Sequence, residues 1–205
     1  MTVFRRICLL AVDPAIKTAW RSDVACPNVA LARNASVADL ILAYRTTVVV
    51  DLSVYATADA LVMEAGLPVL LLPTRETAFK IDSILLAWKS TRESRRAISV
   101  VLPLLMRAKR VLVSAVCHAD EIATAEQELA DVSQRLAGDG VDAAARAEVD
   151  ASGNAGLKLL DIARAEHIDL IVAGGYGHTR LREWVMGGVT RDLIADGGRF
   201  VLLSH

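Results

Sequence analysis

The sequence predicts an α/β fold in which a doubly wound parallel sheet is covered by helices on both faces. Apolar residues come in short unbroken runs, which are typical of strands buried on both sides. Several segments between these runs carry apolar residues at helical spacing, and this alternation is the pattern of a doubly wound protein. The expected strands are residues 7–12, 40–43, 68–72, 84–88, 111–116, 170–173 and 200–203, and the expected helices are residues 91–108, 120–136, 156–167 and 189–195.

The composition indicates a folded, water-soluble protein without a broad charged surface. The chain has 205 residues, and because 54% of them are hydrophobic we do not expect intrinsic disorder. Its 23 basic and 24 acidic side chains leave a formal net charge of −1, so neither nucleic acid nor an anionic membrane is an expected partner. The longest stretches without a charged residue, such as 97–106 and 170–179, are about half the length that a membrane-spanning helix needs.

Metal binding and covalent catalysis find little support in the sequence. Cys8, Cys26 and Cys117 lie far apart and form no Cys-x-x-Cys pair, and the histidines have no ligand-like spacing, so no metal site is expected. No nucleophile-elbow sequence occurs, so no catalytic residue is predicted. The apolar run at 7–12 is short for a signal peptide, which makes the reducing cytoplasm the simplest expected location.

An internal repeat divides the chain into two unequal copies. Residues 38–43 resemble residues 168–173, and a second pair of segments matches at nearly the same offset. The first strands of the two copies are separated by far fewer residues than the other matching segments are. The first copy must therefore lack a stretch after its first strand, and in the second copy this stretch holds a helix, a strand and a helix. We therefore expect a truncated unit at 1–75 and a complete unit at 76–205.

The segment that carries chemistry follows the next-to-last expected strand. Gly174, Gly177 and Gly187 give the spacing Gly-x2-Gly-x9-Gly. Glycines directly after a buried strand let the backbone turn sharply and approach a ligand closely. Gly188 then leads into the short helix at 189–195, whose free N–H groups and positive dipole end suit a phosphate. The spacing matches neither a Walker A loop nor a Rossmann fingerprint.

Residues 174–193 resemble the nucleotide-binding loop of the universal stress protein family. The resemblance extends over residues 79–205 as one complete unit and over residues 1–73 as a truncated one. It implies a five-stranded parallel sheet of strand order 3-2-1-4-5, binding of ATP or AMP, and a role in stress survival. A ligand would then bind where the strand order reverses, as in other doubly wound sheets.

The resemblance also assigns individual residues to a nucleotide site. The residues that match the family's loop, helix start and adenine-side position are Gly174, Gly177, Gly187, Val189, Thr190 and Val116. His178, in the same loop, is a further candidate for a phosphate contact, and an exposed loop histidine is the alternative. Lys89, at the end of the strand at 84–88, is a second candidate, and a solvated or ion-paired lysine is the alternative.

Two positions depart from the family's pattern and leave the function open. Gly188 stands where ATP-binding members carry Ser or Thr, which removes a hydrogen bond to a charged group worth about 1.5–3 kcal/mol. Lys89 stands where those members have an aspartate that holds the adenosine. One interpretation is a regulatory stress-response protein that binds adenine nucleotide weakly, and the other is an interaction module in which the glycine loop is only structural. ATP hydrolysis is the least expected, because no general base is visible near the loop.

The repeat also predicts how the chain assembles. In tandem members of the family the two units dock through their last strands, which here implies intrachain pairing of residues 68–72 with residues 200–203. The truncated unit has lost its second strand, so one edge of its sheet is uncovered. Because proteins rarely leave such an edge bare, we expect a homodimer formed through the truncated unit.

Overall fold

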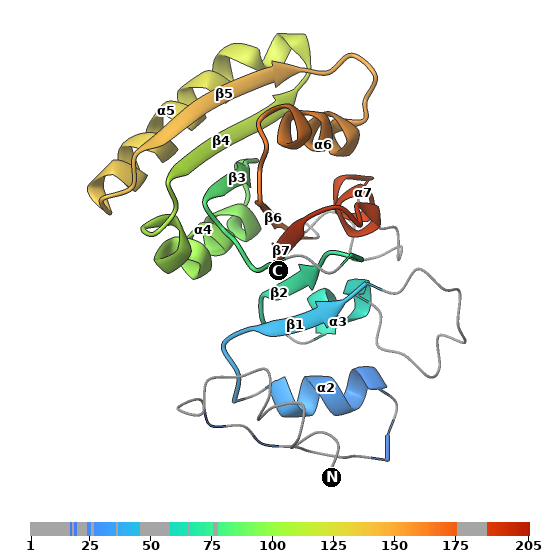
Figure 1. The fold of residues 1–205 in the computed structure, drawn as a ribbon. Helices are drawn as coiled ribbons and strands as arrows, with labels where there is room; N and C mark the ends of the chain where they lie inside the picture. Colours follow the sequence, from blue (N-terminus) through green and yellow to red (C-terminus); the bar gives the residue numbers. More distant parts are fainter. Residues whose placement is uncertain are drawn as a thin grey trace.

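A computed structural model of the protein describes residues 17, 19, 24–25, 27–35, 37–45, 58–64, 66–75, 78–175 and 188–205. The described helices and strands follow one another along the chain as shown in Figure 1. They are α2 (Pro27–Ala35), β1 (Ile41–Tyr44), α3 (Ala58–Glu64), β2 (Val69–Leu72), β3 (Ser83–Ala87), α4 (Arg92–Leu105), β4 (Arg110–Cys117), the 3-10 turn η1 (Ala119–Glu121), α5 (Ile122–Gly138), β5 (Ala143–Val149), α6 (Ala155–Ala165), β6 (Leu170–Gly174), α7 (Gly188–Ala195) and β7 (Phe200–Ser204).

The described strands form one seven-stranded sheet of order β1-β2-β7-β6-β3-β4-β5. Counted from β3, the five strands β3 to β7 have the order 3-2-1-4-5 and pair in parallel, so this prediction is confirmed. β1 and β2 extend the same sheet beyond β7. The expected strand at 7–12 lies outside the described residues.

The joint between the two parts of the chain is an antiparallel strand pair. β2 runs antiparallel to β7, with Val69 opposite Leu203 and Leu71 opposite Val201, so the two segments that were expected to pair do so. β1 pairs in parallel with β2, and the carboxyl ends of both strands therefore lie at the opposite edge of the sheet from those of β3 to β7.

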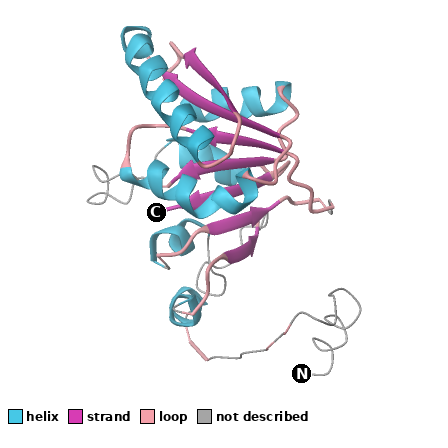
Figure 2. Cartoon of the chain, turned by 90° about the vertical axis from the view of Figure 1, so that its left-hand side faces the viewer, coloured by secondary structure: helices cyan, strands magenta, loops and turns pink. Residues whose placement is uncertain are grey.

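Helices cover both faces of the sheet, as the view in Figure 2 shows. The apolar sides of α4 and α5 pack on one face, and those of α3, α6 and α7 pack on the other. Successive residues of a buried strand belong to the hydrophobic cores on opposite faces of the sheet. In β3, Ile84 and Leu86 face α4 and α5, whereas Leu85 faces α6. This double burial explains why the strands appear in the sequence as unbroken apolar runs. None of the helices within the described ranges combines the length and the apolar character that a membrane crossing requires.

A buried arginine ties β1 to the segment around β7. Arg45, at the end of β1, is only 6% exposed, and its guanidinium donates hydrogen bonds to the carbonyl oxygens of Leu72 (3.1 Å), Leu193 (3.3 Å) and Arg199 (2.8 Å). Burial lowers the pKa of Arg45 to about 10, against the opposing effect of Asp196, and the group therefore stays charged at neutral pH.

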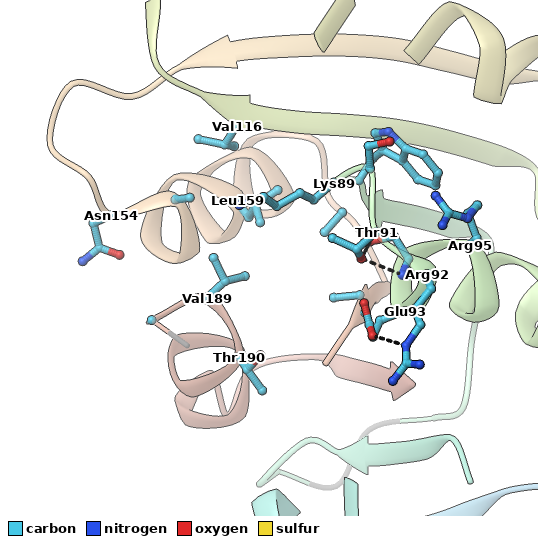
Figure 3. A pocket seen from close by; sticks show the side chains of 18 of the residues that line it. Lys89, Thr91, Arg92, Glu93, Arg95, Val116, Asn154, Leu159, Val189 and Thr190 are labelled. Atoms are coloured by element: carbon cyan, nitrogen blue, oxygen red, sulfur yellow. Dashed lines mark hydrogen bonds and ion pairs between the residues drawn. The ribbon is translucent and has the colours of Figure 1, made fainter. Parts of the chain in front are cut away.

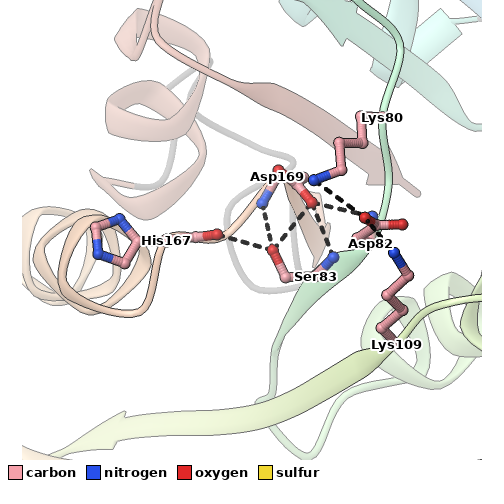
Figure 4. Close-up of polar contacts among 6 residues, drawn as sticks. All are labelled: Lys80, Asp82, Ser83, Lys109, His167 and Asp169. Carbon is pink, nitrogen blue, oxygen red and sulfur yellow. Dashed lines mark hydrogen bonds and ion pairs between the residues drawn. The ribbon is translucent and has the colours of Figure 1, made fainter.

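A polar cluster fixes the starts of β3 and β6 at the edge opposite the carboxyl ends of the parallel strands (Figure 4). The Asp169 carboxylate accepts hydrogen bonds from the backbone N–H groups of Asp82 and Ser83, both at 2.9 Å, and from the Ser83 hydroxyl. Asp82 in turn pairs with Lys80 and Lys109, each at 3.0 Å, and hydrogen bonds from these lysines lower the pKa of its carboxyl group. These groups satisfy one another, so the cluster has a structural role.

Candidate functional site

A cavity of about 1060 Å³ lies at the carboxyl edge of the parallel strands. Its walls come from the ends of β3, β4 and β6 and from the first turns of α4, α6 and α7. The strand order reverses between β3 and β6, and this is where doubly wound sheets bind their ligands. The position of the cavity is therefore the one that the sequence predicts.

The cavity brings together predicted residues that are far apart in the sequence. The predicted site residues that line it are Lys89, Val116, Gly174, Gly188, Val189 and Thr190. They come from four separate segments: the ends of β3, β4 and β6, and the start of α7. Gly177, His178 and Gly187 belong to the same predicted loop and lie outside the described residues.

Gly174 has a packing role that the sequence did not reveal. A Cβ atom at this position would lie 2.7 Å from the backbone nitrogen of Ser94 and 2.8 Å from the carbonyl carbon of Glu93. Real side chains do not tolerate such distances to backbone atoms, so the end of β6 can approach the first turn of α4 only with glycine here. This glycine is explained by the fold, independently of any ligand.

Gly188, by contrast, begins α7 in open space. A Cβ atom there would meet nothing within 4 Å. The neighbouring Thr190 is 5% exposed, and Val189 is partly buried in the core beneath α6 and α7. A side chain at position 188 is therefore sterically possible, and its absence deprives the helix start of a hydroxyl that could contact a phosphate.

The first turn of α4 contributes residues that the sequence analysis missed. Thr91 caps this helix, and its hydroxyl accepts a hydrogen bond from the Ser94 backbone N–H at 3.3 Å. Arg92 forms an ion pair of 2.8 Å with Glu93, whose side chain is 2% exposed. The sequence predicts a helix start at residue 91, but whether its first turn lines the cavity depends on how α4 packs against the sheet.

The charged side chains on the described walls of the cavity are mostly basic (Figure 3). Lys89, Arg92 and Arg95 line it, and Glu93 is the one carboxylate among the described lining residues. Arg92 pairs with Glu93, whereas Lys89 and Arg95 are exposed and have no ion-pair partner among the described residues. Together with three helix N-termini, this arrangement favours an anionic ligand.

The loop between β5 and α6 closes another side of the cavity. The Asp150 carboxylate accepts hydrogen bonds from the Ser152 hydroxyl (2.7 Å), the Ser152 backbone N–H (3.1 Å) and the Asn154 backbone N–H (2.6 Å). The Ser152 hydrogen bond is the main cause of the lowered pKa of Asp150. Asn154 then caps α6 by accepting a hydrogen bond from the Leu157 backbone N–H. This loop therefore holds Gly153 and Asn154 at the wall of the cavity.

Within the described ranges, no three His, Cys, Asp or Glu side chains come together in a group that could hold a metal ion.

Comparisons with known proteins establish the fold. No protein-family model and no curated protein matches the sequence. Solved structures do match: a universal stress protein from Archaeoglobus fulgidus has a TM-score of 0.72 and 13% identity over 99% of this chain and 75% of that chain. UspA from Lactobacillus plantarum has a TM-score of 0.53 and 16% identity over 62% of this chain and 99% of that one. A universal stress protein solved in complex with cAMP has a TM-score of 0.50 and 19% identity over 61% of this chain and 97% of that one. The chain thus has the α/β fold of universal stress proteins, built on a seven-stranded and mostly parallel sheet.

Proposed function

We propose that the protein is a universal stress protein that binds an adenine nucleotide in the cavity at the carboxyl edge of its sheet and acts by regulation rather than by turnover. The observation that carries the proposal is the convergence of six predicted site residues from four segments on one cavity. A similar fold has been solved with cAMP, which supports a nucleotide as the ligand class.

The geometry suggests how the nucleotide would lie. The start of α7 offers backbone N–H groups and a positive dipole end to the phosphates, and Gly174 lines the same cavity. Val116, at the end of β4, lies on the other side of β3 and would face the base. Because Gly188 supplies no hydroxyl, we expect the affinity to be about tenfold lower than with serine at this position.

The decisive experiment uses a pair of variants at Gly188, where there is room for a side chain. An aspartate at a helix start is compatible with the fold, because it stabilises the positive end of the helix, but it repels a phosphate. Asparagine has nearly the same size and no charge. Calorimetric titration of the folded protein with ATP and AMP should show saturable binding by the wild type and by Gly188→Asn, and none by Gly188→Asp.

Two other outcomes of this titration would reject the proposal. Equal binding by Gly188→Asp and Gly188→Asn would place the nucleotide somewhere else. No heat up to millimolar nucleotide, from wild-type protein shown to be folded and free of carried-over nucleotide, would favour the alternative of an interaction module with a purely structural loop.

We further propose that residues 1–75 are a truncated copy of the unit formed by residues 76–205, and that they mediate a homodimer. β1 is the terminal strand of the described sheet, and two of its side chains on the α4 side of the sheet, Leu42 and Tyr44, are 63% and 64% exposed. In the complete unit this face of the sheet is covered by α4 and α5, the helices whose counterparts the sequence repeat indicates to be missing. A second copy of the chain would cover the exposed edge and the apolar face together.

A further inference from the structure

The Lys89 side chain is placed to bind an anion in the middle of the cavity. Lys89 follows β3, which lies between β6 and β4 in the sheet. Its side chain is exposed, lines the cavity and has no ion-pair partner among the described residues. Figure 3 shows it reaching from the end of β3 toward Leu159 on α6, across the space between Val116 and Val189.

The order of the strands determines which part of a bound nucleotide would lie beside Lys89. Neighbouring strands are about 4.8 Å apart, so β6 and β4 are separated by about 10 Å, the scale of a nucleotide from its phosphate to its base. With the 5′ phosphates at Gly174 and the start of α7, and the base at Val116, the middle position at Lys89 belongs to the ribose. An uncharged ribose gives an ammonium group in this position no anionic partner.

We propose that Lys89 forms a second anion subsite, and that the cavity therefore takes an adenine nucleotide with a phosphate on its ribose in addition to the phosphate at its 5′ end. This inference rests on the proposed function, because it takes the direction of the nucleotide from it. Arg95, a second exposed cation on the wall without an ion-pair partner among the described residues, adds to the positive potential.

Positional isomers of one nucleotide test the inference. Adenosine 3′,5′-bisphosphate, adenosine 2′,5′-bisphosphate and ADP have the same atoms and differ in where the second phosphate is attached. We expect the wild-type protein to bind one of the ribose-phosphorylated isomers about tenfold more tightly than ADP, the factor that one hydrogen bond to a charged group supplies. The preferred isomer identifies the ribose hydroxyl that carries the phosphate.

Two neutral variants identify the residue responsible. Lys89→Met removes the charge from an exposed side chain and should bring the affinity for the preferred bisphosphate down to that for ADP, so that the ratio of the two dissociation constants is about one. Lys109→Met makes the same change in the overall charge at the opposite edge of the sheet, and the tenfold preference should persist. Urea unfolding of each variant verifies that it is folded.

The possible failures are distinguishable. If the wild type binds ADP as tightly as both bisphosphates, or if the preference survives in Lys89→Met, the second subsite is rejected and the proposed function stands. If the folded wild type binds none of the three isomers and no ATP, the inference and the proposed function fail together.

Discussion

Gly174 lies so close to Ser94 that a Cβ atom on the glycine would be 2.7 Å from the serine backbone nitrogen. The end of β6 is thereby pressed against the first turn of α4, and the cavity opens beside this contact. The glycine has two possible uses, close approach to a ligand and close approach to another part of the fold. The structure shows the second of these for Gly174.

We expect Gly174→Ala to destabilise the protein even in the absence of nucleotide. The added methyl group meets the backbone of Glu93 and Ser94, which can yield only by moving α4, and overpacking of this kind costs about 1–3 kcal/mol. Urea unfolding measures the change. Gly188→Ala, where the methyl group meets nothing within 4 Å, is the control and should change the free energy of unfolding by less than about 0.5 kcal/mol.

Gly188→Ser should increase the affinity for ATP. The side chain fits at the start of α7 without a clash, and its hydroxyl adds a hydrogen bond to a charged phosphate. A gain of about 1.5 kcal/mol corresponds to roughly tenfold tighter binding in a calorimetric titration. Gly188→Ala fills the same space without the hydroxyl and should leave the affinity near that of the wild type. Equal gains in both variants would contradict a hydrogen bond to phosphate.

The parts of the fold that the sequence predicted are those with strong apolar signals. Runs such as residues 84–88 and 170–173 are buried on both faces, so their composition reports their structure directly. β5 was not among the expected strands, because it is an edge strand whose residues 143–149 are mostly alanine and charged side chains. α3 was missed as well, since a helix of seven residues gives too little periodicity to recognise.

The candidate site, like the fold, was predictable only where a local stretch of sequence carries a strong signal. Glycines after a strand are visible in one stretch of sequence, and the resemblance to the universal stress protein family implied that Val116 and Lys89 belong to the same site. Thr91 and Asn154 reach the cavity because they cap helices that start there. Their role depends on how α4 and α6 are packed against the sheet, which is tertiary information.

Replacing Arg45 by methionine should destabilise the protein strongly. The buried guanidinium donates hydrogen bonds to the carbonyl oxygens of Leu72, Leu193 and Arg199. Without it these acceptors lose this hydrogen-bond donor. We expect a loss of about 2–4 kcal/mol in the free energy of unfolding, measured with urea at neutral pH. Arg107→Met, at an exposed position, is the matched control and should have little effect. Equal stabilities of the two variants would show that the Arg45 hydrogen bonds contribute nothing.

Asp150 should make stability depend on pH in the acid range. Hydrogen bonds from Ser152 and Asn154 hold the pKa of its carboxyl group below the ordinary value of 3.8. A folded-state pKa below the unfolded one adds stability that is present above the unfolded pKa and is lost as the pH falls through the folded pKa. Wild type and Asp150→Asn should therefore differ most above about pH 5 and converge in strong acid. Asp142→Asn, at an exposed position before β5, is the control and should change the stability less than Asp150→Asn does above about pH 5.

The homodimer proposal is tested by a charge placed on the exposed face of β1. Leu42 is 63% exposed on this terminal strand, and burying it against a second copy would make a glutamate there unfavourable, because a buried unpaired carboxylate is costly. Leu42→Glu should therefore shift a dimer to a monomer in sedimentation velocity while the unfolding free energy of the monomer changes little. Val149→Glu places the same charge on β5, at the other edge of the sheet, where the native side chain is 43% exposed, and should leave the dimer intact. A monomeric wild type at high concentration, or a dimer that only Val149→Glu dissociates, would rule out assembly through the truncated unit.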